Sequence, residues 1–211
     1  PTAWWRGVGP THNIFVVESF VDELANKAGK DPLEYRRALL GKSPRALAVL
    51  NLAAEKAGWA KPMPAGSGRG ISVQYAFGSY LSQVAEVAVD KDGTVKVQRL
   101  VCAVDCGYTV NPDTVRAQIE GGAIFGITAV LHGEITLKNG RVEQSNFHNY
   151  PMLRINEAPL IEVYLVPSAE APGGIGEPGT AALAPAVLNA IHAATGKRLR
   201  KLPVDAAQLA T

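Results

Sequence analysis

A change of hydrophobic periodicity at residues 61–70 limits most strongly what this 211-residue chain can fold into. Before it, apolar residues recur at helical spacing, in a helix predicted over 13–28 and in two more that start at Pro32 and Pro44 after capping residues. After it, apolar and polar residues alternate as in strands, and 81–105 is predicted to be a β-hairpin. The expected fold class is therefore α+β, with mixed sheets and hairpins and packed helices.

The sequence KPMPAGSGRG at 61–70 has the proline, glycine and serine content of a linker. It divides the chain into a helical segment, 1–60, and an α+β part, 71–211. The elements expected in the second part are a helix from Asn111 to about Val130, a hairpin over 134–144, a strand over 160–166, a helix over 185–195 and a short strand over 199–204.

Composition excludes several classes of protein. The chain is 47% hydrophobic and 19% charged, as ordinary globular domains are, and its net charge of +2 gives no argument for nucleic-acid binding. No apolar run is long enough to span a membrane and no signal peptide is visible, so we expect a soluble protein of the cytoplasm or the periplasm. Trp4 and Trp5 near the start suggest a segment that belongs inside something larger.

The cysteines and histidines give no metal or nucleophile signature. Cys102 and Cys106 are too few for a disulfide framework and lack the paired spacing of a zinc site, so buried free thiols are expected. The four histidines form neither an HxxH nor an HExxH pattern, and no nucleophile elbow is present. A metal bound directly by protein side chains is therefore not expected.

The stretch GGIGEPGTAALAP, 173–185, holds one acidic residue, Glu177, on a backbone restricted by glycine and proline. From the residues alone, two interpretations stay open. A carboxylate just before a helix start is favoured by the helix dipole, so Glu177 is an N-terminal cap in the first interpretation. In the second it is a general base held rigidly beside a ligand, which the preceding glycines allow to approach the backbone.

Two further stretches could contribute to a ligand site. In AQIEGG, 117–122, a glutamine and a glutamate lie beside paired glycines on a predicted helix. The polar side chains could bind a polar heterocycle. Alternatively, the glutamate lies at the surface and the glycines form a helix–helix contact. In WWRGVGP, 4–10, Arg6 precedes a Gly-x-Gly that could bind an anion through its backbone or form a simple loop.

These motifs occur in the same order in one family. The stretches RGVGPTHNIFVVESFVDELA, VDCGYTVNPDTVRAQIEGGAIFG, QSNFHNYPMLRINEAP and GGIGEPGTAALAPAVLNAIHAATGKRLRKLP span nearly the whole chain. Together they resemble the molybdenum-binding subunit of the xanthine dehydrogenase and aldehyde oxidase family, in particular its isoquinoline 1-oxidoreductase branch. The ordered combination is specific, whereas each motif alone is not.

The resemblance implies a role for each stretch. The glutamate of Gly-x-Gly-Glu-Pro is the active-site base, which is Glu177 here. The residues that the resemblance places on the cofactor are Arg6, Gly7, Gln118, Gly121, Gly122 and Gly176. Relatives that oxidise purines often carry a phenylalanine where this chain has Val8, so Val8 is expected in the substrate pocket and a purine is not the expected substrate.

The resemblance also implies the activity and the partners. The chain is expected to be the C-terminal half of a molybdenum hydroxylase that oxidises N-heterocycles or aldehydes, with water as the oxygen source. Its cofactor would be molybdopterin, in the cytosine dinucleotide form, with molybdenum held by the pterin. Two cysteines cannot build iron–sulfur clusters, so an iron–sulfur partner subunit is expected, and so is the upstream half of the molybdenum subunit. The alternative is a non-catalytic α+β module of the same fold.

Overall fold

Four strands form the central sheet of the computed structural model, which describes residues 3–211. They are β1 (Ser67–Ala76), β2 (Ser79–Val89), β3 (Val95–Asp105) and β6 (Leu160–Leu165), side by side in that order. The first three are antiparallel neighbours, and β6 runs parallel to β3. The predicted hairpin over 81–105 is confirmed as β2 and β3.

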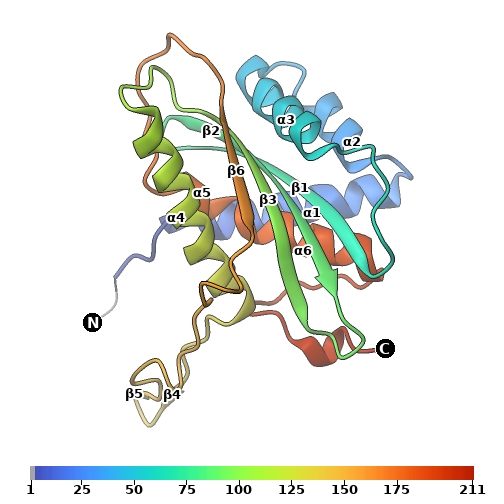
Figure 1. Cartoon of the computed structure of the whole chain (residues 1–211), viewed down its shortest axis with the longest axis vertical. Helices are drawn as coiled ribbons and strands as arrows, with labels where there is room; N and C mark the ends of the chain where they lie inside the picture. Colours follow the sequence, from blue (N-terminus) through green and yellow to red (C-terminus); the bar gives the residue numbers. More distant parts are fainter. Residues whose placement is uncertain (1–2) are drawn as a thin grey trace.

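Helices cover both faces of this sheet (Figure 1). One face carries α3 (Pro44–Ala57), with α2 (Pro32–Leu39) packed beside it. The other carries α4 (Pro112–Leu131), the single turn α5 (Pro178–Ala181) and α6 (Leu183–Thr195). The first helix, α1 (Val8–Lys27), lies along α6 near the edge strand β1. The expected α+β class is confirmed.

Alternation along β1 explains why the two faces carry different helices. Ile71 points into the core under α3, where it packs with Val49 and Leu50 of that helix. Gly68 and Gly70 lie on the opposite face, and a Cβ at either would come within 2.2 Å of the backbone of Ala190 in α6. Only glycine therefore lets α6 lie this close to the sheet.

Three local expectations differ from the structure. The helix predicted from residue 13 begins at Val8, because Pro10 falls in the first turn, where a missing N–H costs nothing. Residues 67–70 of the predicted linker belong to β1, since their glycines accommodate α6 rather than form a flexible segment. Residues 199–204, all within the described part, contain no strand, so that prediction is wrong.

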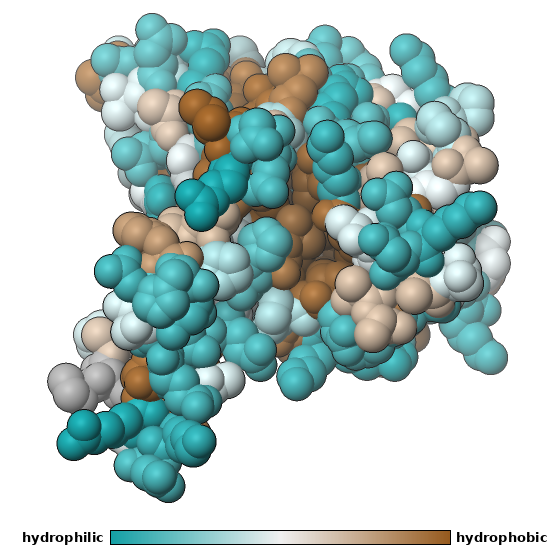
Figure 2. Space-filling model, turned by 60° about the horizontal axis from the view of Figure 1, so that its bottom comes forward, coloured by the Kyte–Doolittle hydropathy of each residue, from teal (hydrophilic) through white to brown (hydrophobic). Residues whose placement is uncertain are grey.

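The connection from α4 to β6 forms an arm that projects from the body (Figure 1). Its predicted Asn-Gly hairpin is confirmed, although β4 (Leu137–Lys138) and β5 (Arg141–Val142) are only two residues long. Both turn residues, Asn139 and Gly140, have positive φ, as a tight hairpin turn requires. Figure 2 shows the underside of the molecule, where apolar side chains gather in a central hollow bounded by hydrophilic ones.

Across residues 3–211, no helix has both the length and the apolar content that a membrane crossing requires.

Candidate functional site

Glu177 lies immediately before α5, but its side chain does not cap that helix. The carboxylate makes no hydrogen bond to an N–H of α5. Instead its Oε1 accepts the backbone N–H of Gly7, at 3.0 Å, from a segment 170 positions away in the sequence. The interpretation of Glu177 as a helix cap is therefore wrong for its side chain.

Arg6 joins the same cluster through its guanidinium. Its Nε donates to the carbonyl of Gly176 at 2.7 Å, and its Nη2 lies 3.3 Å from Oε1 and 3.5 Å from the carbonyl oxygen of Gln118. The structure thus brings together five of the residues that the sequence singled out. They are Arg6, Gly7, Gln118, Gly176 and Glu177, and they come from three distant segments.

Gly7 is needed at the point where this cluster closes. Its φ is +94°, and a Cβ would lie 2.1 Å from Oγ1 of Thr11. The next residue, Val8, also has a positive φ, of 37°, which is unusual for a β-branched side chain. The N–H groups of Gly7 and Val8 donate to Glu177 and to the Trp5 carbonyl, so both already have partners inside the chain.

The glycines of α4 and the loop divide into two kinds. Gly122 is buried, and a Cβ there would lie 3.2 Å from Oγ1 of Thr180, whose hydroxyl donates to the Gly122 carbonyl. Gly121 is exposed, with nothing within 4 Å of an added Cβ. Gly176 is also exposed, and only Oε1 of Gln118 would come near, at 3.8 Å. Gly122 therefore serves helix packing, whereas Gly121 and Gly176 leave backbone open to a ligand.

The two charged side chains of the cluster keep their charges available. Within residues 3–211, neither Arg6 nor Glu177 has an ion-pair partner within 4.0 Å. Among residues 3–211, the hydrogen bonds of the Arg6 guanidinium go to neutral oxygens, and that of the Glu177 carboxylate comes from a neutral N–H. Both side chains are partly exposed, so the arrangement can bind an anionic group and accept a proton at one surface.

Sequence reasoning missed an aromatic contact beside the cluster. The rings of Trp5 and Phe125 stack with centroids 4.8 Å apart and planes 25° from parallel. A signal was present, because Phe125 follows Gln118 by seven residues and so shares its face of α4. The stack anchors the residue before Arg6 onto the helix that carries Gln118.

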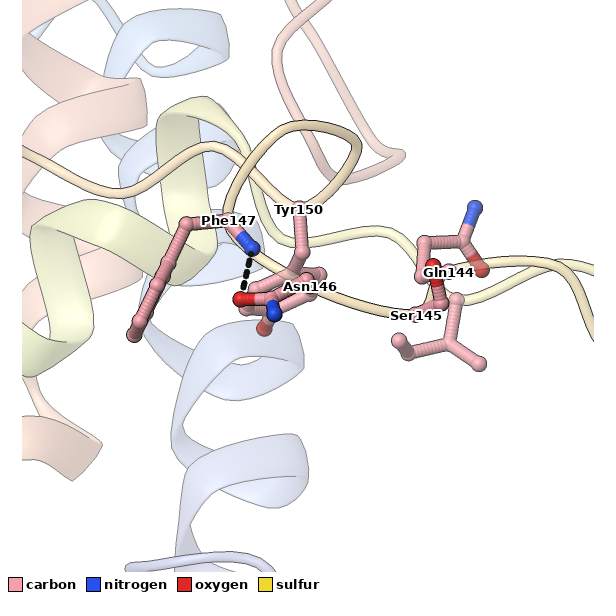
Figure 3. A pocket seen from close by; sticks show the side chains of 6 residues that line it. Gln144, Ser145, Asn146, Phe147 and Tyr150 are labelled. Atoms are coloured by element: carbon pink, nitrogen blue, oxygen red, sulfur yellow. Dashed lines mark hydrogen bonds between the residues drawn. The ribbon is translucent and has the colours of Figure 1, made fainter.

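A separate hollow of about 280 Å³ lies at the arm (Figure 3). It is lined by Ile135, Gln144, Ser145, Asn146, Phe147 and Tyr150. None of these side chains is charged at neutral pH, and Oδ1 of Asn146 accepts the Phe147 N–H. This hollow therefore lacks the acid–base groups that the Glu177 cluster has.

Cys102 and Cys106 are buried free thiols, as expected. Burial raises the pKa of the Cys102 thiol to about 12, so it stays protonated at neutral pH. In residues 3–211, no three His, Cys, Asp or Glu side chains are grouped so that they could hold a metal ion.

The class of protein follows from comparison with known families. Residues 21–159 match the family described as the molybdopterin cofactor-binding domain. The chain therefore belongs to the molybdopterin cofactor-binding domain family. The matched range includes Gln118, Gly121 and Gly122, whereas Arg6, Gly7, Val8, Gly176 and Glu177 lie outside it.

Individual relatives carry the likeness over nearly the whole chain. The beta subunit of isoquinoline 1-oxidoreductase from Brevundimonas diminuta is 38% identical over 206 residues, which is 95% of this chain and 26% of the relative. A nicotinate dehydrogenase subunit from Pseudomonas putida is 39% identical over 223 residues, 97% of this chain and 19% of the relative. The chain thus spans about a quarter or less of these relatives' length.

A solved structure shows the same fold. The aldehyde oxidoreductase from Desulfovibrio gigas superposes with a TM-score of 0.76 over 97% of this chain and 41% of that one, at 16% identity. The relatives and this structure are named as oxidoreductases, as the family resemblance implied.

Proposed function

We propose that this chain is the part of a molybdenum hydroxylase that holds one side of the molybdopterin and supplies the catalytic base, Glu177. The observation that carries the proposal is the convergence of Arg6, Gln118 and Glu177 from segments 112 and 170 positions apart in the sequence. The hydrogen bonds that join these segments leave the charges of Arg6 and Glu177 without an ion-pair partner among residues 3–211, so both charges can interact with a ligand.

The residues present fit such a cofactor. The exposed backbone at Gly121 and Gly176 has room that a side chain would fill, so a flat, polar group can approach it closely. Arg6 presents a guanidinium, the preferred side chain for phosphate and for planar acceptors, and Gln118 presents an amide. When bound, the cofactor supplies the redox chemistry and carries the metal. Gly122 acts indirectly, because its small size lets α4 pack against α5.

Glu177 moves a proton in this proposal. Its Oε1 is fixed by the Gly7 N–H, whereas Oε2 has no hydrogen-bond donor among residues 3–211. Oε2 would take a proton from the water that supplies the oxygen atom. As the new C–O bond forms at an electron-poor carbon of the substrate, the C–H bond at that carbon would break, and its two electrons would go to the bound cofactor. A base held at one oxygen and free at the other is suited to this transfer.

The substrate is an N-heterocycle or an aldehyde that is not a purine. Val8 is half-buried beside Gly7 and offers an aliphatic surface, where an aromatic ring would offer a stacking platform. The names of the relatives, which include oxidoreductases of isoquinoline and nicotinate, support a heterocycle.

The site needs further polypeptide to enclose it. Gln118, Gly121 and Gly176 are exposed, whereas hydroxylation chemistry requires a site that excludes bulk water. The upstream half of the subunit covers this side in our proposal, and the chain alone is inactive. An iron–sulfur subunit receives the electrons, and the pterin has the cytosine dinucleotide form.

Gly121→Val in the complete enzyme tests the cofactor contact. A Cβ there has nothing within 4 Å, so the free energy of unfolding should change by less than about 1 kcal/mol. Molybdenum and pterin content should nevertheless fall strongly, because the branched side chain blocks the approach to the backbone. Gly41→Val, at a glycine that is equally open but lies in the turn after α2, is the matched control. Normal cofactor content in Gly121→Val would contradict the proposal.

A further inference from the structure

Four buried polar side chains lie on the sheet directly behind the Glu177 loop. They are Ser72 and Gln74 of β1 and Ser79 and Gln83 of β2. Each is at most 4% exposed, in a position where an apolar side chain would normally face the helices. Burying a polar group is costly unless it forms a hydrogen bond, so the partners of these side chains are informative.

The two glutamines hold two consecutive peptide groups that follow Glu177, Pro178–Gly179 and Gly179–Thr180. Nε2 of Gln74 donates to the carbonyl of Pro178 at 2.7 Å, and Nε2 of Gln83 donates to that of Gly179 at 3.0 Å. The two glutamines point to the same face of the sheet. Gln83 on β2 is paired with Ser72 on β1, and Ser72 is two residues from Gln74 in that strand.

The two serines fix the segment at its ends. The Ser79 hydroxyl donates to the carbonyl of Gly174 at 2.8 Å, three residues before Glu177. The Ser72 hydroxyl donates to the carbonyl of Ala182 at 2.6 Å, five residues after it. Four hydrogen bonds from the sheet therefore hold the backbone on both sides of Glu177.

Stability alone explains the glutamines poorly. The amide oxygens of Gln74 and Gln83 have no hydrogen-bond partner among residues 3–211, and a buried unpaired acceptor costs roughly 1–3 kcal/mol. That cost offsets what each glutamine gains through its amide hydrogens. What each amide does supply is a fixed place for a carbonyl within two residues of Glu177.

We infer that Gln74 and Gln83 are positioning residues, which hold the Pro178–Gly179 and Gly179–Thr180 peptides so that the Glu177 carboxylate points to Gly7. This inference rests on the proposed role of Glu177 as the base. The glutamines touch neither substrate nor cofactor, and they act only through the loop.

Gln74→Met and Gln83→Met in the complete enzyme remove the donor and keep the length of the side chain. Hydrogen exchange of amides in 174–182 should become faster in both variants, and kcat should fall about 10–100-fold with KM changed by less than about threefold. In a Glu177→Gln background the same substitutions should leave the residual turnover unchanged, because their effect passes through Glu177.

Ser82→Ala is the matched control. Its hydroxyl is buried on β2 beside Gln83, but it donates to the Ser72 carbonyl rather than to the loop. Its loop exchange and kcat should match the wild type. If the methionine variants do not fold, Ser79→Ala removes a single hydroxyl from the same row, and kcat should fall about 2–10-fold, the scale of one hydrogen bond.

Two results would overturn the inference: unchanged loop exchange in the variants, or an equal fall in kcat in both backgrounds. Failure of the proposed function looks different. In that case Glu177→Gln itself has near-normal turnover, and the exchange of 174–182 still decides whether the glutamines hold the loop.

Discussion

Two carboxylates, that of Glu18 in the middle of α1 and that of Glu177, which lies before α5 and contacts the start of α1, are held in opposite ways. Glu18 is buried and accepts the Nε–H of Arg36 at 2.7 Å and the N–H of Val73 at 3.0 Å. Glu177 is partly exposed and accepts one N–H, from Gly7. Burial raises the pKa of Glu18 despite the nearby guanidinium.

Charge balance shows what this difference means. Around Glu18, the carboxylate of Asp22 lies 3.5 Å from Arg36 and 2.9 Å from Arg198, so two anions face two cations. These ion pairs join α1 to α2 and to the segment after α6. The Glu177 cluster contains Arg6 but, in the described part of the chain, no ion pair. A buried network of paired charges is costly to break at one partner, whereas charges without ion-pair partners can interact with a ligand or a proton.

The largest expected effect is on turnover at the Glu177 cluster. Glu177→Gln keeps the shape of the side chain and an oxygen that can accept the Gly7 N–H, but it cannot accept a proton. Turnover per molybdenum in the complete enzyme should fall by about 10²–10⁴-fold, as typical for loss of a general base. Steady-state rates normalised to metal content measure this. Near-normal turnover would show that Glu177 is not the base and would contradict the proposed difference in role between Glu177 and Glu18.

The next effect is on stability at the buried network. Arg36→Met leaves Glu18 and Asp22 buried with less compensation, so the free energy of unfolding should fall by about 3–5 kcal/mol. Urea unfolding measures it. Arg200→Met is the control, because Arg200 pairs with Glu23 at the surface and should change stability little. Equal losses in the two variants would show that burial does not distinguish these ion pairs.

A smaller effect is expected at Gly7, the backbone position that joins α1 to the Glu177 cluster. Gly7→Ala forces a Cβ against Thr11 at a positive φ, which should cost roughly 1–3 kcal/mol and loosen the contact with Glu177. Gly9→Ala, two residues on and inside α1, meets nothing within 4 Å and should be neutral or slightly stabilising. Thermal melting and turnover of both variants test this, and an equal response at the two glycines would contradict it.

The smallest effect is a pH dependence at a third ion pair. The hydrogen bonds from Arg45 lower the pKa of Asp105, which is buried at the end of β3. A carboxyl whose pKa is lower in the folded protein stabilises the fold at pH values above its pKa in the unfolded chain, about 3.9. That stabilisation is lost as the pH falls through the pKa in the folded protein. Melting temperatures between pH 6 and roughly pH 3 should therefore fall less steeply in Arg45→Met. A slope identical to that of the wild type would refute this assignment.

Local signals predicted most of the elements. The side chains of Asp31 and Asn111 each accept two backbone N–H groups, so the helix starts expected at Pro32 and Pro112 are observed. Local composition assigns Gly68 and Gly70 to a linker, but both lie in β1. Their packing partner, α6, lies more than a hundred residues later in the sequence. Local composition cannot reveal such a partner.

The site shows the same limit more sharply. The residues around Glu177 are compatible with two roles, a helix cap and a general base. The family resemblance is what favours the general base. Neither the residues nor the resemblance indicated that the Gly7 N–H would bind the carboxylate, or that Gln74 and Gln83 would hold the following peptides. Hydrogen bonds between a side chain and a distant backbone group leave no periodic trace in a sequence.

The stability of Glu177→Gln tests the central claim most directly, which is that this carboxylate is free for chemistry rather than tied into the fold. In urea unfolding of the complete subunit, the account predicts a change of less than about 1 kcal/mol, because glutamine still accepts the one hydrogen bond. A loss of about 3 kcal/mol or more, the scale expected for Arg36→Met, would place Glu177 with the structural carboxylates and contradict the account.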